Sequence, residues 1–343
     1  MHCELLVPAL FPTREPAREA LAALRLPALE LLLARGRAAG AEPQAPERWL
    51  VEAFSGDDSG EDAPLAAGAL TVLADGGEPG DEAWLRADPV HLQLGREGPA
   101  LVPSTAFEVT REEAEALCEA LNRHFAGALT FYPLVPARWC ARLTDEFAAP
   151  AESPLQLAGE DVNQRFAAEP AARRWHALLT EIQMALHEHP VNAERERRGA
   201  PTLNSLWLWG AGRAPREAAG PWQSVCADEP LALGMARLAG VARRALPAAA
   251  EEWLARAPED GRHLLVLDAL RAAHALDDAE AYAARLRTLE ARWFAPLLAA
   301  LRAGRVGMIT LHVPDAADAR SFETVGGDLR RIWRRAQALG RYA

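Results

Sequence analysis

The chain has few cysteines and no long hydrophobic run. Its 343 residues include four cysteines, which lie far apart and form no CxxC pair. Scattered cysteines are typical of reduced thiols in a cytosolic protein and provide no zinc knuckle. No stretch approaches the ~18 consecutive apolar residues of a membrane span. The N-terminal MHCELLVPAL is too short and too acidic for a signal peptide. We therefore expect a soluble, cytoplasmic protein with no membrane partner.

Positive charge and the common catalytic motifs are also lacking. The net charge is −11, and arginine far exceeds lysine. A nucleic-acid-binding domain needs a basic face, so we expect no nucleic-acid partner. No GxSxG, Walker or HExxH motif occurs in the sequence. The sequence therefore gives no indication of a serine hydrolase, P-loop or zincin site.

Apolar residues make up half of the chain, and its length exceeds what one core usually serves. From 171 to 339 helical patterns alternate with short apolar strands, which is typical of a mostly parallel sheet with helices on both faces. We predict an α/β core from residues 1–95 and 166–343, with residues 96–165 inserted as a small α+β domain. The first strand, Cys3 to Leu10, and the late strand Val306 to Val313 should share one sheet. Residues 231–246 and 322–339 are expected to be helices.

The stretch from Glu181 to Gly212 combines several unlike patterns. A helical pattern ends at His189-Pro190, a polar loop is expected at residues 192–198, and residues 203–209 alternate as a strand before two glycines. Apolar residues on both faces favour a strand inside a covered sheet. We predict that Leu206 and Leu208 are buried and that Trp209 ends the strand facing a cleft, because ligands bind at the carboxyl ends of strands in open α/β sheets. A buried central strand with a tight turn is the alternative.

Several polar residues could bind a ligand or a metal, and each has a plainer interpretation. His187, His189 and Asn192 could be metal ligands, or they could interact with the last carbonyls of a helix. The arginines at 195, 197 and 198 could hold a phosphate, or they could balance nearby glutamates in a solvated loop. His274, with the aspartates at 277 and 278, could bind a metal or begin a helix. His312 is expected to be a core histidine.

The segment HPVNAERERRGAP…LNSLWLWGAG, residues 189–212, resembles the signature of the archaeal-type, cofactor-independent phosphoglycerate mutases. Other segments are similar to that family and to the alkaline phosphatase superfamily in the same order: residues 26–36, 110–147, 231–240 and 281–301. The resemblance is closer still to a bacterial group of phosphoglycerate-mutase-like, RpfE-type regulatory proteins. It implies an alkaline-phosphatase-like fold. The ligand-binding candidates are His189, Asn192, Arg195, Asn204, Trp209, Gly210 and Gly212.

The chain departs from the family where the chemistry should be. The resemblance implies two metal ions held by aspartates and histidines, with a serine nucleophile. An Asp-Gly expected after the first strand reads Val7 to Leu10 here, the late Asp-His pair reads Leu311-His312, and the serine has no secure equivalent. His274 and His312 are the weak remnants of a metal site. Two-metal catalysis needs a full ring of ligands, and fold resemblance cannot restore it.

These departures predict a protein that has lost metal-dependent catalysis, with no catalytic residue and no cofactor. It would be a regulatory or ligand-binding protein whose partner is a small phosphorylated ligand or another protein. The alternative is an active metal-dependent phosphoglycerate mutase or phosphatase with rearranged ligands and two Mn or Zn ions.

Overall fold

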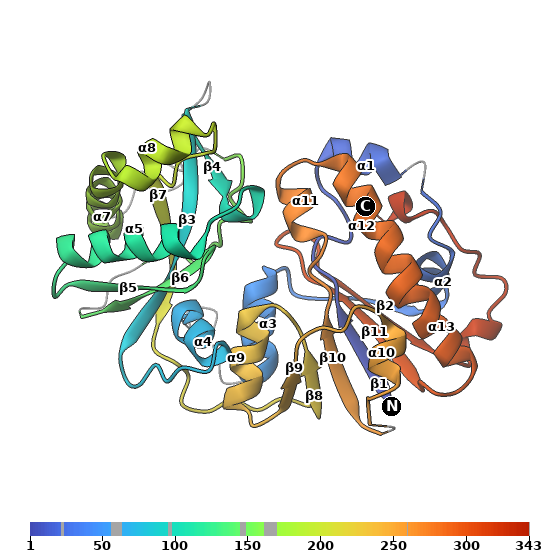
Figure 1. Ribbon diagram of the computed structural model, residues 1–343. Helices are drawn as coiled ribbons and strands as arrows, with labels where there is room; N and C mark the ends of the chain where they lie inside the picture. Colours follow the sequence, from blue (N-terminus) through green and yellow to red (C-terminus); the bar gives the residue numbers. More distant parts are fainter. Residues whose placement is uncertain are drawn as a thin grey trace. The chain divides into compact units, whose positions relative to one another are not determined.

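The computed structural model describes residues 1–21, 24–55, 64–94, 98–144, 149–160, 170–258 and 260–342. The chain forms two compact units. The first contains Met1–Asp58 and Glu217–Ala343, and the second contains Ser59–Arg216. Each unit has its own sheet, which Figure 1 shows.

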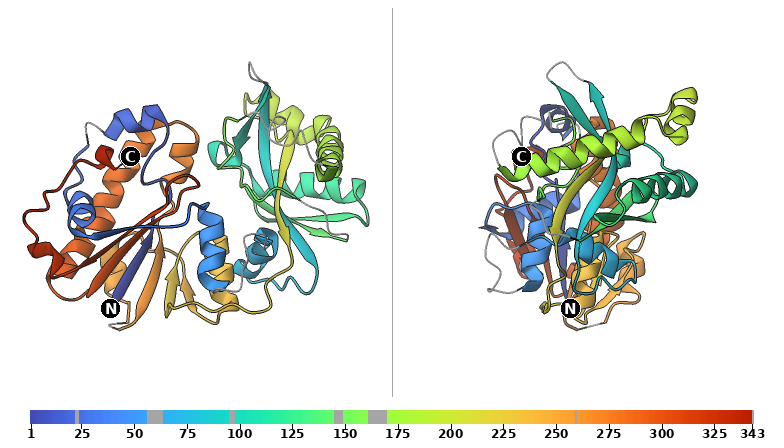
Figure 2. Two further views of the ribbon diagram at one scale, coloured as in Figure 1. Left: turned by 180° about the vertical axis from the view of Figure 1, so that it is seen from behind. Right: turned by 90° about the vertical axis from the view of Figure 1, so that its left-hand side faces the viewer.

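The first unit is built on a seven-stranded, mostly parallel sheet with the order β2–β12–β11–β1–β10–β8–β9. β1 pairs in parallel with β10 and β11, and in Figure 2 the blue first strand lies between orange and red strands. β12 and β2 extend the sheet in antiparallel fashion. The strands are β1 (His2–Leu6), β2 (Arg37–Gly40), β8 (Ser224–Cys226), β9 (Ala242–Arg244), β10 (Arg262–Val266), β11 (Met308–Val313) and β12 (Arg320–Val325).

Helices cover both faces of this sheet. Cys3 and Leu5 belong to an apolar core with side chains of α2, α12 and α13. On the other face, the ring of Trp49 in α3 lies 4.9 Å from that of His312 in β11. The helices are α1 (Glu15–Leu21), α2 (Pro27–Arg35), α3 (Pro46–Ser55), α9 (Pro230–Leu238), α10 (Ala250–Leu254), α11 (Arg271–Ala275), α12 (Ala279–Leu289) and α13 (Ala295–Arg302). The expected α/β class is confirmed, as is the shared sheet of β1 and β11.

The second unit has an antiparallel sheet organised around one long strand, β3. This strand pairs with β4 and β6, and also with β7, while β5 follows β6. Figure 2 shows α7 running across β7. The elements are α4 (Ala67–Ala74), β3 (Ala83–Leu94), β4 (Pro99–Pro103), α5 (Arg111–His124), β5 (Leu129–Val135), β6 (Arg138–Leu143), α7 (Pro170–His187), α8 (Pro190–Arg197) and β7 (Ser205–Gly212).

The boundaries of the units differ from the predicted boundaries at 95 and 165. β7 pairs with β3 rather than with any strand of the first sheet, so the second unit extends from Ser59 to Arg216. The apolar residues on both faces of β7 were correctly interpreted as a covered strand. The cover comes from α4 and α7 of the second unit, because both pack against β7. The pattern therefore indicated burial but could not identify the sheet.

Three local expectations were wrong. Residues 192–197 belong to helix α8, which ends at Arg197, because Pro190 stands in its first turn and His189 caps it. The helix expected over residues 231–246 ends at Leu238, since Gly240 takes a left-handed φ of 65° and β9 then pairs with β8. Residues 322–339 begin in strand β12, where Phe322 pairs with β11 on one side and β2 on the other.

Candidate functional site

The candidate site lies in the first unit, where parallel strands end at one edge of the sheet. The register places the ends of β1, β10 and β11 side by side, and β8 ends next to β10. In open α/β sheets this edge is the usual place for a ligand. Carboxylates follow three of these strands, in the sequence after β8, β10 and β11.

An arginine whose side chain is only 12% exposed stands among the carboxylates of this edge. Arg271, the first residue of α11, donates to the Glu47 carboxylate of α3. Its own backbone N–H lies 3.1 Å from the carbonyl oxygen of Asp268, which follows β10. Burial raises the pKa of Asp268, and the Arg271 charge opposes that rise. The guanidinium thus supplies the positive charge for a group of acidic side chains.

Glu229 is the third acidic neighbour of Arg271. Its carboxylate caps α9 by accepting a 2.8 Å hydrogen bond from the N–H of Ala232. Burial raises the pKa of Glu229 to about 7, although the helix N–H groups and Arg271 lower it. A carboxyl group with this pKa is partly protonated at neutral pH. The N-cap bond and the shared arginine explain how it can be buried.

A second polar cluster occupies the sheet face under α3. Glu4 of β1 is 2% exposed, and its Oε2 lies 3.2 Å from Nε2 of His312. Arg262 donates to Oε1 of Glu4 at 2.6 Å. Burial would raise the pKa of Glu4, but the bonds from His312 and Arg262 outweigh it and hold the pKa at about 2. His2 lies nearby, with Nε2 2.8 Å from Oγ1 of Thr310.

The loop after β1 is apolar and is held by its backbone. Tyr282 of α12 donates its hydroxyl to the carbonyl oxygens of Ala9 and Leu10, at 2.8 and 3.1 Å. Ala9 has a φ of 59°, which a residue with a Cβ rarely adopts. This segment borders a cavity of about 200 Å³ whose lining includes Arg18 and Arg320.

The two weak metal remnants have different neighbours. His312 lies against Glu4 and Trp49 on the sheet face. Nε2 of His274, in α11, lies 3.4 Å from Oγ1 of Thr13 beyond the sheet edge. Among the described residues no group of three or more His, Cys, Asp or Glu side chains is arranged to hold a metal ion.

The two aspartates near His274 make local contacts. Asp277 accepts a 2.9 Å bond from Arg14. Asp278 caps α12 by accepting from the N–H of Ala281, also at 2.9 Å. The helix start considered as one alternative for this segment is present, one residue later than Asp277.

In the second unit, His189 and Asn192 shape the connection between α7 and β7. Nδ1 of His189 accepts from the N–H of Val191 and caps α8. Asn192 is 3% exposed and bonds through its amide to the backbone of Leu186 and Leu203. Both side chains are bonded to the chain itself.

The three arginines considered for a phosphate have different environments. Arg195 is 2% exposed, donates to Glu113 at 2.7 Å and also bonds the carbonyl oxygens of Glu108 and Pro201. Arg198 donates to the other Glu113 oxygen at 2.6 Å. Arg197 pairs with Glu194 on the surface. Glu113 in turn closes the capping box with Thr110 that opens α5.

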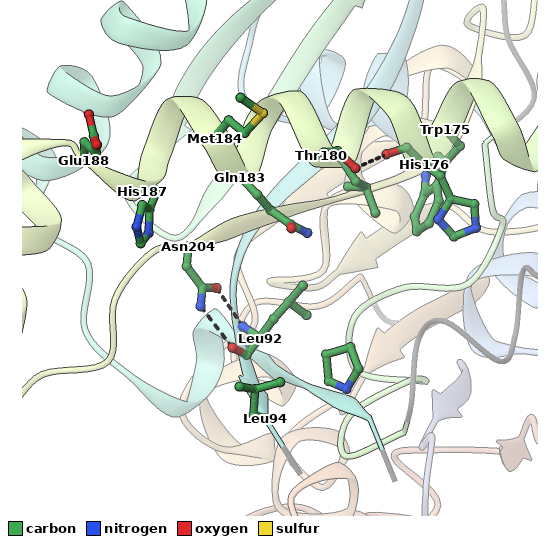
Figure 3. Close-up of a pocket in the computed structure, with 12 residues that line it drawn as sticks. Leu92, Leu94, Trp175, His176, Thr180, Gln183, Met184, His187, Glu188 and Asn204 are labelled. Carbon is green, nitrogen blue, oxygen red and sulfur yellow. Dashed lines mark hydrogen bonds between the residues drawn. The ribbon is translucent and has the colours of Figure 1, made fainter. Parts of the chain in front are cut away.

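Asn204 lies beside a groove between α7 and the end of β3. The groove has a volume of about 700 Å³, and Figure 3 shows its wall, which includes His176, Gln183 and His187 of α7. The Asn204 amide bonds both the N–H and the carbonyl oxygen of Leu92, at 2.8 and 2.9 Å. The polar atoms of the Asn204 side chain therefore hydrogen-bond the segment before β7 to β3 at the rim of the groove.

The end of β7 is packed against the unit's own chain. The expectation that Trp209 ends the strand was wrong, because β7 continues to Gly212 and Trp209 is 3% exposed. Its indole N–H donates to Oδ2 of Asp88 at 2.7 Å. Gly210 has a φ of 59°, and a Cβ there would lie 2.5 Å from the Cβ of Ala67. The glycines of this motif permit close helix packing.

Four residues at the sheet edge and face were not selected from the sequence: Glu4, Glu47, Glu229 and Arg271. Two of them had a sequence signal. Glu4 is an acidic residue within an apolar strand, and Glu229 precedes a proline at a helix start, where acidic caps are common. The pairing of Glu47 with Arg271 joins residues 224 positions apart, and no local pattern predicts it.

Comparison with known proteins points to one family. Residues 79–192 match the family described as 2,3-bisphosphoglycerate-independent phosphoglycerate mutase. A protein of that name from Methanosarcina barkeri is 27% identical over 157 residues, 45% of this chain and 37% of that protein. The Methanosarcina mazei protein of the same name is 26% identical over 212 residues, 58% of this chain and 51% of that protein. The matches thus span about half, or less, of the length of these relatives.

Among solved structures, the PH0037 protein from Pyrococcus horikoshii shares the fold. The TM-score is 0.55 at 14% identity, and the match covers 95% of this chain and 87% of that chain. The family match at residues 79–192 falls wholly within the second unit. The cluster around Arg271 belongs to the first unit, so the family match does not include it.

Proposed function

We propose that this phosphoglycerate-mutase-like protein does not perform metal-dependent phosphoryl transfer and serves as a regulatory or ligand-binding protein. The main support is Arg271, which lies where carboxylates gather at the carboxyl edge of the parallel sheet. A guanidinium stays charged at every ordinary pH and binds carboxylates with several N–H groups. It binds the carboxylate of Glu47 and supplies the positive charge near Asp268 and Glu229, a role that a divalent cation would otherwise take.

The loop after β1 supports the same proposal. Residues Val7 to Leu10 offer no carboxylate or hydroxyl to a metal or a phosphoryl group. Tyr282 already binds the carbonyl oxygens of Ala9 and Leu10. Two-metal catalysis stabilises both the entering and the leaving oxygen, so an incomplete set of ligands supplies little of it.

The ligand we propose is a small phosphorylated molecule at the cavity bordered by Arg18 and Arg320, with another protein as the alternative partner. The cavity adjoins the segments that follow β1 and β11. Its volume of about 200 Å³ suits a small metabolite. Asp318 pairs with Arg320, so an entering phosphate would have to share that guanidinium. Thermal-shift titration with 3-phosphoglycerate should stabilise the wild type and leave Arg18→Ala unchanged.

The decisive experiment is a mutase assay on the full chain with added Mn²⁺, Mg²⁺ or Zn²⁺. We expect no conversion of 3-phosphoglycerate above the background of a His312→Ala variant. Turnover that disappears in His312→Ala would instead favour an active mutase or phosphatase with rearranged ligands. Two tightly held Mn or Zn ions per chain after dialysis would favour that alternative as well.

Arg271 can be tested separately by metal titration. Removing its charge in Arg271→Ser should leave the surrounding carboxylates free to bind Mn²⁺, which calorimetry would detect as a new binding event. Arg271→Lys keeps one positive charge and should bind no more Mn²⁺ than the wild type. Circular dichroism establishes that both variants are folded. If a folded Arg271→Ser binds no more Mn²⁺ than the wild type, Arg271 does not act in place of a metal.

A further inference from the structure

The segment Arg330–Arg335, sequence RRIWRR, exposes two large apolar side chains between arginines. Ile332 is 75% exposed and Trp333 is 74% exposed, and they are consecutive. Four of the six residues are arginines, in a chain whose net charge is −11. Scattered single apolar residues on a surface are normal, but an adjacent exposed pair within a basic segment requires an explanation.

The segment is held in place by contacts on both sides of the apolar pair. Arg35 donates to the carbonyl oxygen of Leu329, and Arg334 donates to that of Gly36 at 2.9 Å. Further along the chain Leu339 is 1% exposed, and the ring of Tyr342 stacks on Phe11 with centroids 6.1 Å apart. The exposure of Ile332 and Trp333 is therefore built into the fold.

The charge of the segment is mostly uncompensated. Arg331 pairs with Asp328 at 2.8 Å. Arg330 and Arg335 are exposed, and among the described residues neither forms an ion pair. The surface therefore keeps a positive charge beside the apolar pair, and its partner should be anionic with an apolar layer beneath.

We propose that residues 330–335 dock this protein onto an anionic membrane surface. Tryptophan favours the level of the lipid headgroups, isoleucine enters the upper acyl region, and arginines bind lipid phosphates. A nucleic acid would use the tryptophan for stacking but gives the aliphatic Ile332 no role. None of the described helices combines the length and apolar character needed to cross a bilayer. The expectation of no membrane partner was based on the absence of a membrane-spanning segment. That absence says nothing about docking at the membrane surface.

This surface is independent of the proposed function, and vesicle flotation of the full chain tests it. Vesicles of phosphatidylcholine and phosphatidylglycerol in equal amounts should carry the wild type, whereas pure phosphatidylcholine vesicles should not. The double variant Ile332→Ser with Trp333→Ser should bind about tenfold more weakly or worse. Arg335→Gln alone should lower affinity about fivefold, and added salt should weaken the wild type.

Matched controls come from the second unit. Met184→Ser removes an apolar side chain that is 71% exposed, and Arg197→Gln removes a surface arginine. Neither should alter vesicle binding, and circular dichroism should show every variant folded. The proposal fails if the wild type ignores the anionic vesicles or if the variants bind as well as it does. A dimer that dissociates in the serine variant, or retention on single-stranded nucleic acid in place of vesicles, would also overturn it.

Discussion

Glu4 shows how neighbours decide the state of a buried carboxyl group. Hydrogen bonds from His312 and Arg262 lower its pKa from 4.5 to about 2, despite the opposing effect of burial. A depressed folded-state pKa stabilises the protein above the unfolded value, and this contribution disappears as the pH falls from 4.5 towards 2. Glu4→Gln should therefore cost roughly 2–3 kcal/mol at pH 7 and flatten the acid limb of the stability curve. Urea unfolding across this pH range measures both effects, and an unchanged acid limb would contradict the assignment.

The arginines at 195 and 197 belong to one short helix but should differ in energetic weight. Arg195→Ala leaves the Glu113 carboxylate, which is 9% exposed, without its buried partner and should cost about 3–5 kcal/mol. Arg197→Ala removes an exposed i,i+3 pair and should cost about 0.5 kcal/mol or less. Denaturant midpoints of the two variants give the comparison. Similar losses of unfolding free energy in both variants would mean that the buried Arg195–Glu113 ion pair stabilises the fold no more than the exposed pair does.

Sequence reasoning treated these arginines alike because charge alone does not reveal burial. The turn of α8 places Arg195 inward and leaves Arg197, and Arg198 just after the helix, exposed. The same difficulty concealed Arg271, whose partners come from distant segments. Local patterns could identify caps such as Thr110 with Glu113, since both partners lie within one helical turn.

At the scale of elements, β7 gives a clear test of core packing. Leu206 and Leu208 are fully buried, as the alternation of apolar residues predicted. Leu206→Ala should cost about 2–5 kcal/mol, because it removes buried methyl groups and leaves a cavity. Leu94→Ala, at a side chain that is 89% exposed, is the control and should change the unfolding free energy by less than about 0.5 kcal/mol. A small loss at Leu206 would place the strand near the surface.

Helices and strands could be predicted where a repeat of apolar residues extended over many positions or ended at a clear signal such as a proline. The helix that ends before Pro190 and the strands β1 and β11 were anticipated in this way. Strand β12 was mistaken for a helix because a basic segment follows it in the sequence, and only its pairing with β11 and β2 identifies the strand. Strand pairing joins residues far apart in the sequence, which a local pattern cannot encode.

At the scale of the whole molecule, the sequence predicted a core assembled from both ends of the chain and a separate insertion. The sequence did not give the boundaries of the two units, because these depend on the pairing of β7 with β3. That pairing places the stretch before Gly212 in the second unit. The resemblance carried by that stretch therefore concerns the second unit, whereas Glu4, His312 and Arg271 stand in the first. The ligand-binding candidates chosen from the motif therefore belong to the second unit, and the edge of the parallel sheet belongs to the first.

Two units with separate cores should unfold in two steps, and point variants can assign each step. The first unit buries Leu5, Phe294 and Leu311, and the second buries Phe131 and Trp207. Domains with their own cores can fold independently. Calorimetry of the full chain should therefore show two transitions. Glu4→Gln should lower only one of them at pH 7, and Leu206→Ala only the other. A fragment of residues 64–216 should reproduce the transition sensitive to Leu206→Ala. A single transition moved by both substitutions would show instead that the two cores unfold cooperatively.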